Sequence, residues 1–117
     1  MTSSSQRPSS EAMLIAALRS RASTLSPEAM AIAEQLKQHA TTLERRGSSH
    51  DALLKFNAFA QHYKGLYDLP VPGLSEAEWG TFVQSVRRLS RTVVREQGLD
   101  ASLLGRIHSF LHGRANR

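Results

Sequence analysis

The chain has 117 residues, of which 40% are hydrophobic and none is cysteine. This length favours one domain with a buried core, and the lack of cysteine excludes disulfides, thiolate metal sites and a cysteine nucleophile. The net charge is +5, and the excess arises in residues 81–117, where seven Arg stand against Glu96 and Asp100. Any electrostatic function is therefore expected in the last third of the chain.

The first ten residues are rich in serine and lack the apolar stretch of a signal peptide. No apolar run approaches the ~20 residues that a membrane-spanning helix needs. We therefore expect a cytoplasmic protein without a membrane segment. Residues 1–10 are expected to form a flexible N-terminal segment, and residues 11–117 a single helical domain.

Five segments show the periodicity of amphipathic helices and none alternates like a strand, so we expect an all-α fold, a compact bundle of about five helices. The first covers residues 11–23. The second begins at Pro27 behind Ser26 as N-cap, keeps one face apolar through about four turns, and ends at Gly47. His39 falls beside that face, where we expect a hydrogen-bonded polar group at the edge of the core or a residue that sets helix register.

The third segment begins at the capping pair Ser48 and Asp51 and is expected to continue to Gly65. Residues 68–73 contain two prolines and form a connector. The fourth begins at a capping box of Ser75 and Glu78, carries four arginines off its apolar stripe, and ends at Gly98. The fifth covers residues 100–113.

The apolar stripes of the second, third and fourth segments run close to a repeat of 3.5 residues, which is typical of a seam that faces one partner helix. The seam is either the core of an intramolecular bundle or, in part, an interface with another chain. Because small helical domains often complete a thin core by oligomerising, we expect a homodimer.

Motifs for chemistry are sparse. His108 and His112 stand four residues apart, as in a two-histidine metal face, but no third ligand is indicated. The sequence contains no glycine-rich phosphate loop and no nucleophile motif. We therefore predict a protein that is not an enzyme and needs no metal or cofactor.

The fourth and fifth segments also suggest a small helix-turn-helix DNA-binding protein, with Gly98 in the turn. Against this alternative, the first helix of the motif would be too long, and Arg106 is the single strong base reader of the second. Direct nucleic-acid binding is therefore the second hypothesis.

The order of segments resembles the small quorum-sensing anti-activators that act on LuxR-type (LasR-like) transcriptional regulators. The likeness lies in the serine-rich head, LSPEAMAIAEQL, DALLKFNAFAQHYKGLYDLPVPG and SEAEWGTFVQSVRRLSRTVV. It implies an all-helical dimer that binds the ligand-binding domain of an acyl-homoserine-lactone receptor. The bound protein would cover the surface through which the receptor dimerises, so that the receptor loses its DNA. No catalysis and no cofactor are implied.

An interface of this kind needs an apolar or aromatic centre with an arginine-bearing rim. The third and fourth segments supply both materials, and we select the candidates on chemistry alone. Core packing is the alternative for each apolar residue. The predicted centre consists of Phe56, Phe59, Tyr63, Trp79, Phe82, Val86 and Leu89, and the predicted rim of Arg87, Arg88 and Arg91.

Overall fold

The computed structural model describes residues 9–99, and within that range it is all-helical, as the sequence predicts. The elements are α1 (Ser10–Thr24), the short 3₁₀ turn η2 (Pro27–Ala29), α2 (Met30–Arg45), α3 (His50–Gln61), a second 3₁₀ turn η3 (Leu66–Asp68) and α4 (Glu76–Glu96). The predicted fifth helix, with Arg106, His108 and His112, lies outside the described residues. None of the helices in residues 9–99 is both long and apolar enough to cross a membrane.

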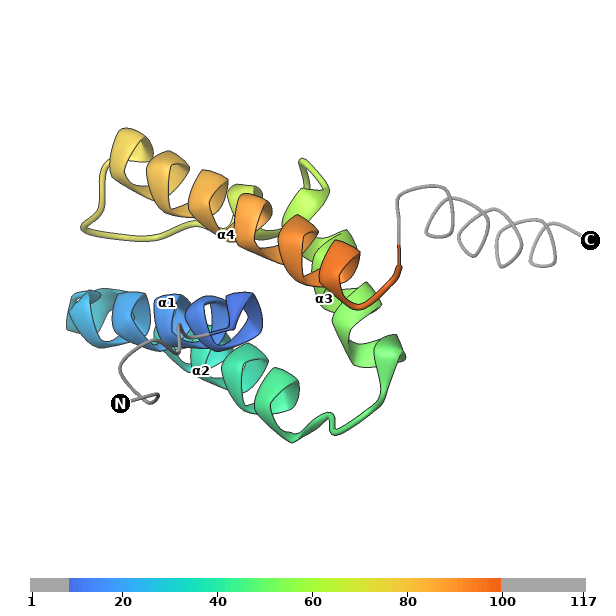
Figure 1. Cartoon of the computed structure of the whole chain (residues 1–117). Helices are drawn as coiled ribbons and strands as arrows, with labels where there is room; N and C mark the ends of the chain where they lie inside the picture. Colours follow the sequence, from blue (N-terminus) through green and yellow to red (C-terminus); the bar gives the residue numbers. More distant parts are fainter. Residues whose placement is uncertain (1–8, 100–117) are drawn as a thin grey trace, which may run out of the picture.

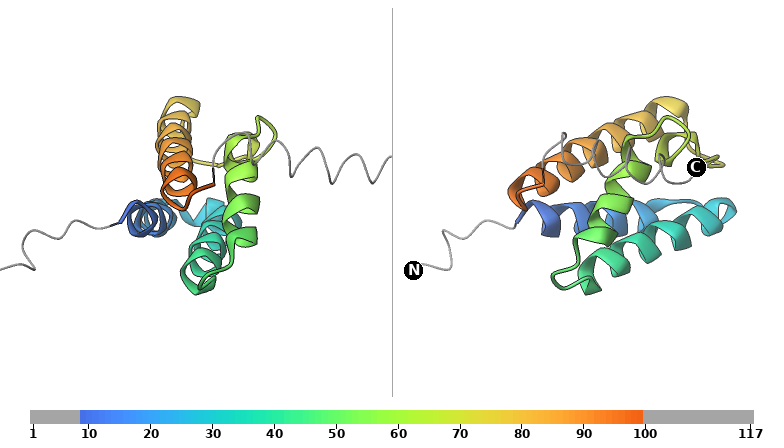
Figure 2. Two further views of the ribbon diagram at one scale, coloured as in Figure 1. Left: turned by 45° about the vertical axis from the view of Figure 1, so that its right-hand side comes forward. Right: turned by 90° about the vertical axis from the view of Figure 1, so that its right-hand side faces the viewer.

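The helix α1 lies between α2 and α4 and runs antiparallel to both (Figure 1). Its first turn meets the last turns of the other two, since Glu11 pairs with Arg46 and Ser10 donates a hydrogen bond to Glu96. The helix α3 crosses the group at a steep angle and packs mainly against α4, as the turned views show (Figure 2). The arrangement exposes the end of α3 beside the middle of α4.

The core forms where the apolar stripes meet. The predicted stripe of the second segment is entirely buried, because α2 faces α1 along its length. The buried apolar side chains come from every helix: Leu14, Leu18, Ala22, Ala29, Ile32, Ala33, Leu36, Ala40, Leu43, Leu53, Phe56, Ala60, Leu66, Trp79, Phe82, Val83, Val86, Val93 and Val94. The stripes of the seam are thus largely used within one chain.

The predicted third helix ends early. It stops at Gln61 instead of continuing to Gly65, and His62 is extended. The chain then turns so that Leu66 is fully buried and its carbonyl oxygen accepts a hydrogen bond from the indole of Trp79 at 3.1 Å. Gly65 permits this turn, because a Cβ there would lie 1.9 Å from the carbonyl oxygen of Phe59.

The helix starts agree with the sequence in part. The Ser75 hydroxyl accepts from the Glu78 amide at 3.1 Å, as a capping box requires, and donates to the Glu78 carboxylate at 3.0 Å. The predicted cap at Ser48 is wrong, since Ser49 holds the N-cap position of α3 without a side-chain hydrogen bond. At Pro27 the chain first makes the turn η2, and the α-helix begins at Met30.

Candidate functional site

The structure places four of the predicted interface residues in the core. The exposed fraction is 4% for Phe56, 5% for Trp79, 7% for Phe82 and zero for Val86. Their stripe packs against neighbouring helices of the same chain, so these four side chains present almost no surface to a partner. Phe59 and Leu89 are half-buried at the edge of the core.

Tyrosine side chains form the exposed apolar part of the site. Tyr63 follows the end of α3 and is 68% exposed, with the ring of His62 stacked on it at 4.9 Å between centroids. Tyr67, which sequence analysis did not select, is 47% exposed in η3. Both tyrosines lie outside α-helix because the chain turns after Gln61.

Arg87 of α4 is held against both neighbouring segments. Its Nε donates to the carbonyl oxygen of Ala60 at 2.8 Å, and its guanidinium lies 5.8 Å from the centre of the Tyr67 ring. The bond to Ala60 satisfies one of the carbonyl groups left free in the last turn of α3. A cation above an aromatic face adds attraction. Arg87 is therefore fixed in position and half-buried.

Gln61 positions a second arginine. Its Nε2 donates to Asn57 Oδ1 at 3.2 Å and to the Arg87 carbonyl oxygen at 3.0 Å. Because both amide protons are used, Oε1 is the atom left to accept from Arg91 Nη1, at 2.9 Å. Behind this contact the buried Ser90 hydroxyl donates to Asn57 Oδ1 at 2.6 Å. A polar layer thus joins α3 to α4 beneath the arginines.

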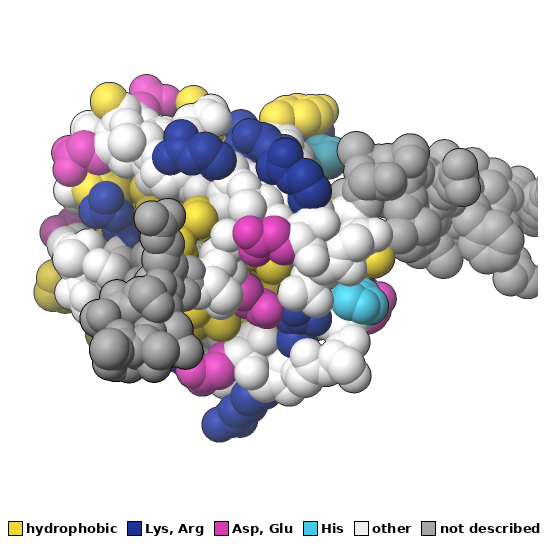
Figure 3. All heavy atoms as spheres, in the orientation of Figure 1, with side chains coloured by type: hydrophobic (Ala, Val, Ile, Leu, Met, Phe, Trp, Pro, Cys, Tyr) yellow, Lys and Arg dark blue, Asp and Glu magenta, His cyan; other side chains and the backbone are white. Residues whose placement is uncertain are grey.

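We call Tyr63, Tyr67, Arg87, Arg88 and Arg91 the Tyr–Arg face. Lys and Arg side chains gather over α4 next to hydrophobic side chains in the space-filling view (Figure 3). Arg88 is exposed and makes no ion pair or side-chain hydrogen bond with another described residue. The face combines aromatic surface, fixed guanidinium groups and free positive charge.

Three residues of the polar layer were not predicted from the sequence: Asn57, Gln61 and Ser90. A signal for two of them was present, because Asn57 and Ser90 interrupt the apolar stripes of facing helices. A polar residue at such a position often fixes the register of a helix pair. No signal identified Gln61, whose role depends on the turn that follows it.

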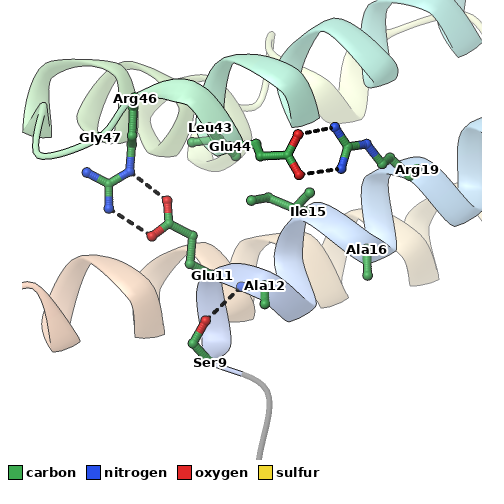
Figure 4. A pocket seen from close by; sticks show the side chains of 10 residues that line it. All are labelled: Ser9, Glu11, Ala12, Ile15, Ala16, Arg19, Leu43, Glu44, Arg46 and Gly47. Atoms are coloured by element: carbon green, nitrogen blue, oxygen red, sulfur yellow. Dashed lines mark hydrogen bonds and ion pairs between the residues drawn. The ribbon is translucent and has the colours of Figure 1, made fainter.

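A hollow of about 700 Å³ lies between α1 and α2. Two ion pairs cross it (Figure 4). Arg46 contacts Glu11 through Nε at 2.6 Å and Nη2 at 2.9 Å, and this hydrogen-bonded carboxylate raises the pKa of Arg46. Hydrogen bonds from Arg19 lower the pKa of Glu44 at the exposed end. Because these charges are already paired, the two ion pairs serve to join α1 to the end of α2.

His39 lies in a smaller hollow of about 290 Å³ between α2 and α3. Its ring stacks on Phe59 at 5.0 Å between centroids and meets the edge of Phe56 at 5.3 Å. Its buried Nε2 has no hydrogen-bond partner among the described residues. The hydrogen bond expected for His39 at the edge of the core is therefore not formed by this atom within residues 9–99. Burial lowers the pKa of His39.

Within residues 9–99, no group of three His, Asp or Glu side chains is placed to hold a metal ion. Comparisons with protein-family models, with curated proteins and with solved structures gave no match. The candidate site is therefore defined by its geometry alone.

Proposed function

We propose that this protein is an anti-activator that binds the ligand-binding domain of a LuxR-type (LasR-like) transcription factor, blocks its dimerisation and so prevents DNA binding. The observation that carries the proposal is the Tyr–Arg face. Tyrosine and arginine are among the residues most enriched at energetically dominant positions of protein interfaces. The resemblance of the segment order to the anti-activators indicates which class of partner to test.

The geometry of the face favours a protein partner of defined shape. Arg87 and Arg91 are held by α3, and tyrosine loses little conformational freedom on binding. Groups that are already ordered lose less entropy on association, which raises affinity without further contact area. The face thus suits a partner that it meets without rearrangement.

Occlusion accounts for inhibition without chemistry. A regulator that reads a two-fold symmetric operator needs its own two-fold dimer, so covering the dimer surface removes the DNA-bound state. In this proposal the chain acts in the cytoplasm as a homodimer, and it uses no cofactor and catalyses no reaction.

The alternative, a small DNA-binding protein, has support in the arginines of α4, since arginines also neutralise phosphates. Its recognition helix would lie outside the described residues. The two proposals differ in whether the chain itself contacts DNA.

Fluorescence anisotropy of a labelled operator tests the proposal. A lactone-bound LuxR-type regulator is first bound to the operator, and the full chain is then added. We expect the anisotropy to fall to that of free DNA. The chain added to the operator without the regulator should leave the anisotropy of the free DNA unchanged. The Tyr63→Ala/Arg88→Ala variant should need a higher concentration, whereas Lys37→Ala on the exposed side of α2 should act like the wild type. An operator that stays bound across a panel of such regulators would refute the proposal, and binding by the chain alone would favour the alternative.

A further inference from the structure

The guanidinium groups of Arg87 and Arg91 are only partly satisfied. Arg87 donates through Nε to Ala60, and Arg91 donates through Nη1 to Gln61. Each guanidinium has five N–H donors. Both Nη groups of Arg87, and the Nε and Nη2 of Arg91, make no hydrogen bond with another described residue. Each arginine is therefore held by one edge, while its other donors have no partner within residues 9–99.

The positive charge on this side of α4 has little counter-charge in its own helix, because Glu96, which follows Arg95, accepts a hydrogen bond from Ser10 of α1. Arg87, Arg91 and Arg95 follow at four-residue spacing, and residues 79–95 contain no Asp or Glu. Like charges at this spacing destabilise a helix by a few tenths of a kcal/mol per pair. Hydrogen bonds to α3 nevertheless order two of these side chains, Arg87 and Arg91. An acidic ligand would relieve the repulsion.

The excess positive charge of the described residues is confined to α4, which favours a short acidic protein segment as the ligand. Apart from the four arginines of α4, the described residues carry seven basic and nine acidic side chains. Arg87 and Arg91 are about 6 Å apart along the helix axis at the rise of 1.5 Å per residue. Nucleic-acid-binding proteins also carry basic residues along a helix, but the spacing of Arg87 and Arg91 matches two carboxylates one helical turn apart on a partner helix.

We infer that Arg87 and Arg91 form a preorganised carboxylate-binding pair, which receives an acidic helix of the protein partner with two Asp or Glu residues four positions apart. Gln61 is a positioning residue, because it holds Arg91 through Oε1 and is itself fixed by Asn57 and Arg87. Planar guanidinium groups bind carboxylates through two parallel hydrogen bonds, which lysine does not reproduce. The inference rests on the proposed function in taking the partner to be a protein.

The first experiment titrates the full chain with a capped, alanine-rich helical peptide that carries two glutamates four residues apart, and follows the arginine Nε–H signals by NMR. We expect saturable shifts at Arg87 and Arg91 and weaker binding of the same peptide with glutamines. Arg87→Lys/Arg91→Lys keeps the net charge but should lose about tenfold or more in affinity, as expected for charge-assisted hydrogen bonds. Arg19→Lys/Arg45→Lys, on α1 and α2, is the matched control.

Equal binding of the glutamine peptide, or an unchanged affinity of the Arg87→Lys/Arg91→Lys variant, would overturn the inference. If that variant is unfolded by circular dichroism, Arg91→Lys alone replaces it, since the contact of Arg87 with α3 then remains. A DNA duplex that displaces the peptide, with a steep loss of affinity on adding salt, would also overturn the inference in favour of phosphate binding.

A second arm separates the inference from the proposed function. The wild type and the variants are titrated against the ligand-binding domain of a LuxR-type regulator. Glutamate-peptide binding without receptor binding would leave the inference standing and refute the proposed function for that receptor. Receptor binding that is unchanged by Arg87→Lys/Arg91→Lys would leave the proposed function standing and refute the inference.

Discussion

The Ser90 hydroxyl meets Asn57 Oδ1 at 2.6 Å in the interior between α4 and α3. Ser90 is fully buried and Asn57 is 4% exposed. Because a buried polar group is costly when unpaired, this contact favours one register of the two helices over others. The register in turn places Arg87 beside Ala60 and Arg91 beside Gln61, so the buried pair supports the exposed Tyr–Arg face.

Replacing Ser90 with alanine should lower the free energy of unfolding by about 1 kcal/mol, since it removes a buried hydrogen bond with little change in volume. Asn57→Ala should cost more, because it also leaves a cavity and frees Gln61. Urea denaturation of both single variants and the double variant measures the coupling. We expect the double variant to be more stable than the sum of the single losses predicts. Strict additivity would contradict the proposed link.

The ion pair of Arg46 and Glu11 should contribute more to stability than that of Arg19 and Glu44. The Arg46 side chain is 4% exposed, and its guanidinium also donates to the Ser49 carbonyl oxygen at 2.8 Å. We expect Arg46→Ala to lower the free energy of unfolding by about 2 kcal/mol, because it leaves the part-buried Glu11 carboxylate without its donor. Arg19→Ala removes an exposed pair and should have a smaller effect. Equal midpoints of chemical denaturation for the two variants would disprove this ranking.

Two glycines should respond in opposite ways to alanine. Gly65→Ala places a Cβ against the Phe59 carbonyl and should lower stability by about 1–3 kcal/mol, as overpacking does. Gly80 lies inside α4, where the nearest atom to a Cβ would be Tyr67 Cε2 at 3.9 Å. Gly80→Ala should therefore stabilise the protein by about 0.5–1 kcal/mol through helix propensity.

Thermal melts, together with tryptophan fluorescence, test this pair. The Gly65→Ala spectrum should also change, because the turn fixes the hydrogen bond between Trp79 and Leu66. A Gly65→Ala protein with unchanged melting and fluorescence would show that the turn does not need glycine.

His39 should make the protein less stable in mild acid. Because burial lowers the pKa of His39 in the folded state, the unfolded chain binds the proton more strongly. Its contribution to stability is fully present above the ordinary histidine pKa of about 6.5 and declines as the pH falls through the lowered value. Asp51 and Lys55 line the same hollow. Carboxylates ordinarily titrate near pH 4, so measurements from pH 7.5 to 5.5 report on histidine protonation with little contribution from carboxylates.

Urea denaturation across that range should show a loss of stability in the wild type and a smaller loss in His39→Leu, which keeps an apolar contact with Phe59. The other histidines serve as an internal reference because both proteins contain them. Parallel pH profiles would contradict the assignment.

The sequence predicts the buried faces of α2 and α4 well because their stripes are long and regular. The Ser75 cap of α4 is confirmed, whereas the predicted Ser26 cap forms no side-chain hydrogen bond and α2 begins only at Met30. The end of α3 is mispredicted for a different reason. Phe56, Phe59, Tyr63 and Leu66 continue a helical spacing, yet burial of Leu66 beneath Trp79 overrides it. Such long-range contacts leave no trace in local periodicity.

The exposure of the candidate site residues is harder to predict from the sequence than the fold. Aromatic composition does not tell a core residue from an exposed one, and Trp79 and Phe82 belong to the core because α4 is covered by other helices of the chain. The contact of Arg87 with Ala60 depends on how α3 crosses α4. Sequence pattern identified the arginines as a group, and the structure separates the held arginines from the exposed Arg88.

Size-exclusion chromatography with light scattering shows whether the chain separates the two subunits of a receptor dimer. The full chain is run alone and then mixed with a lactone-bound ligand-binding domain of a LuxR-type regulator, at two salt concentrations. At both salt concentrations we predict a complex whose mass shows that the receptor domain is bound to the chain and has lost its own dimer partner. A receptor dimer that elutes unchanged, with no complex at either concentration, would contradict the account for that receptor.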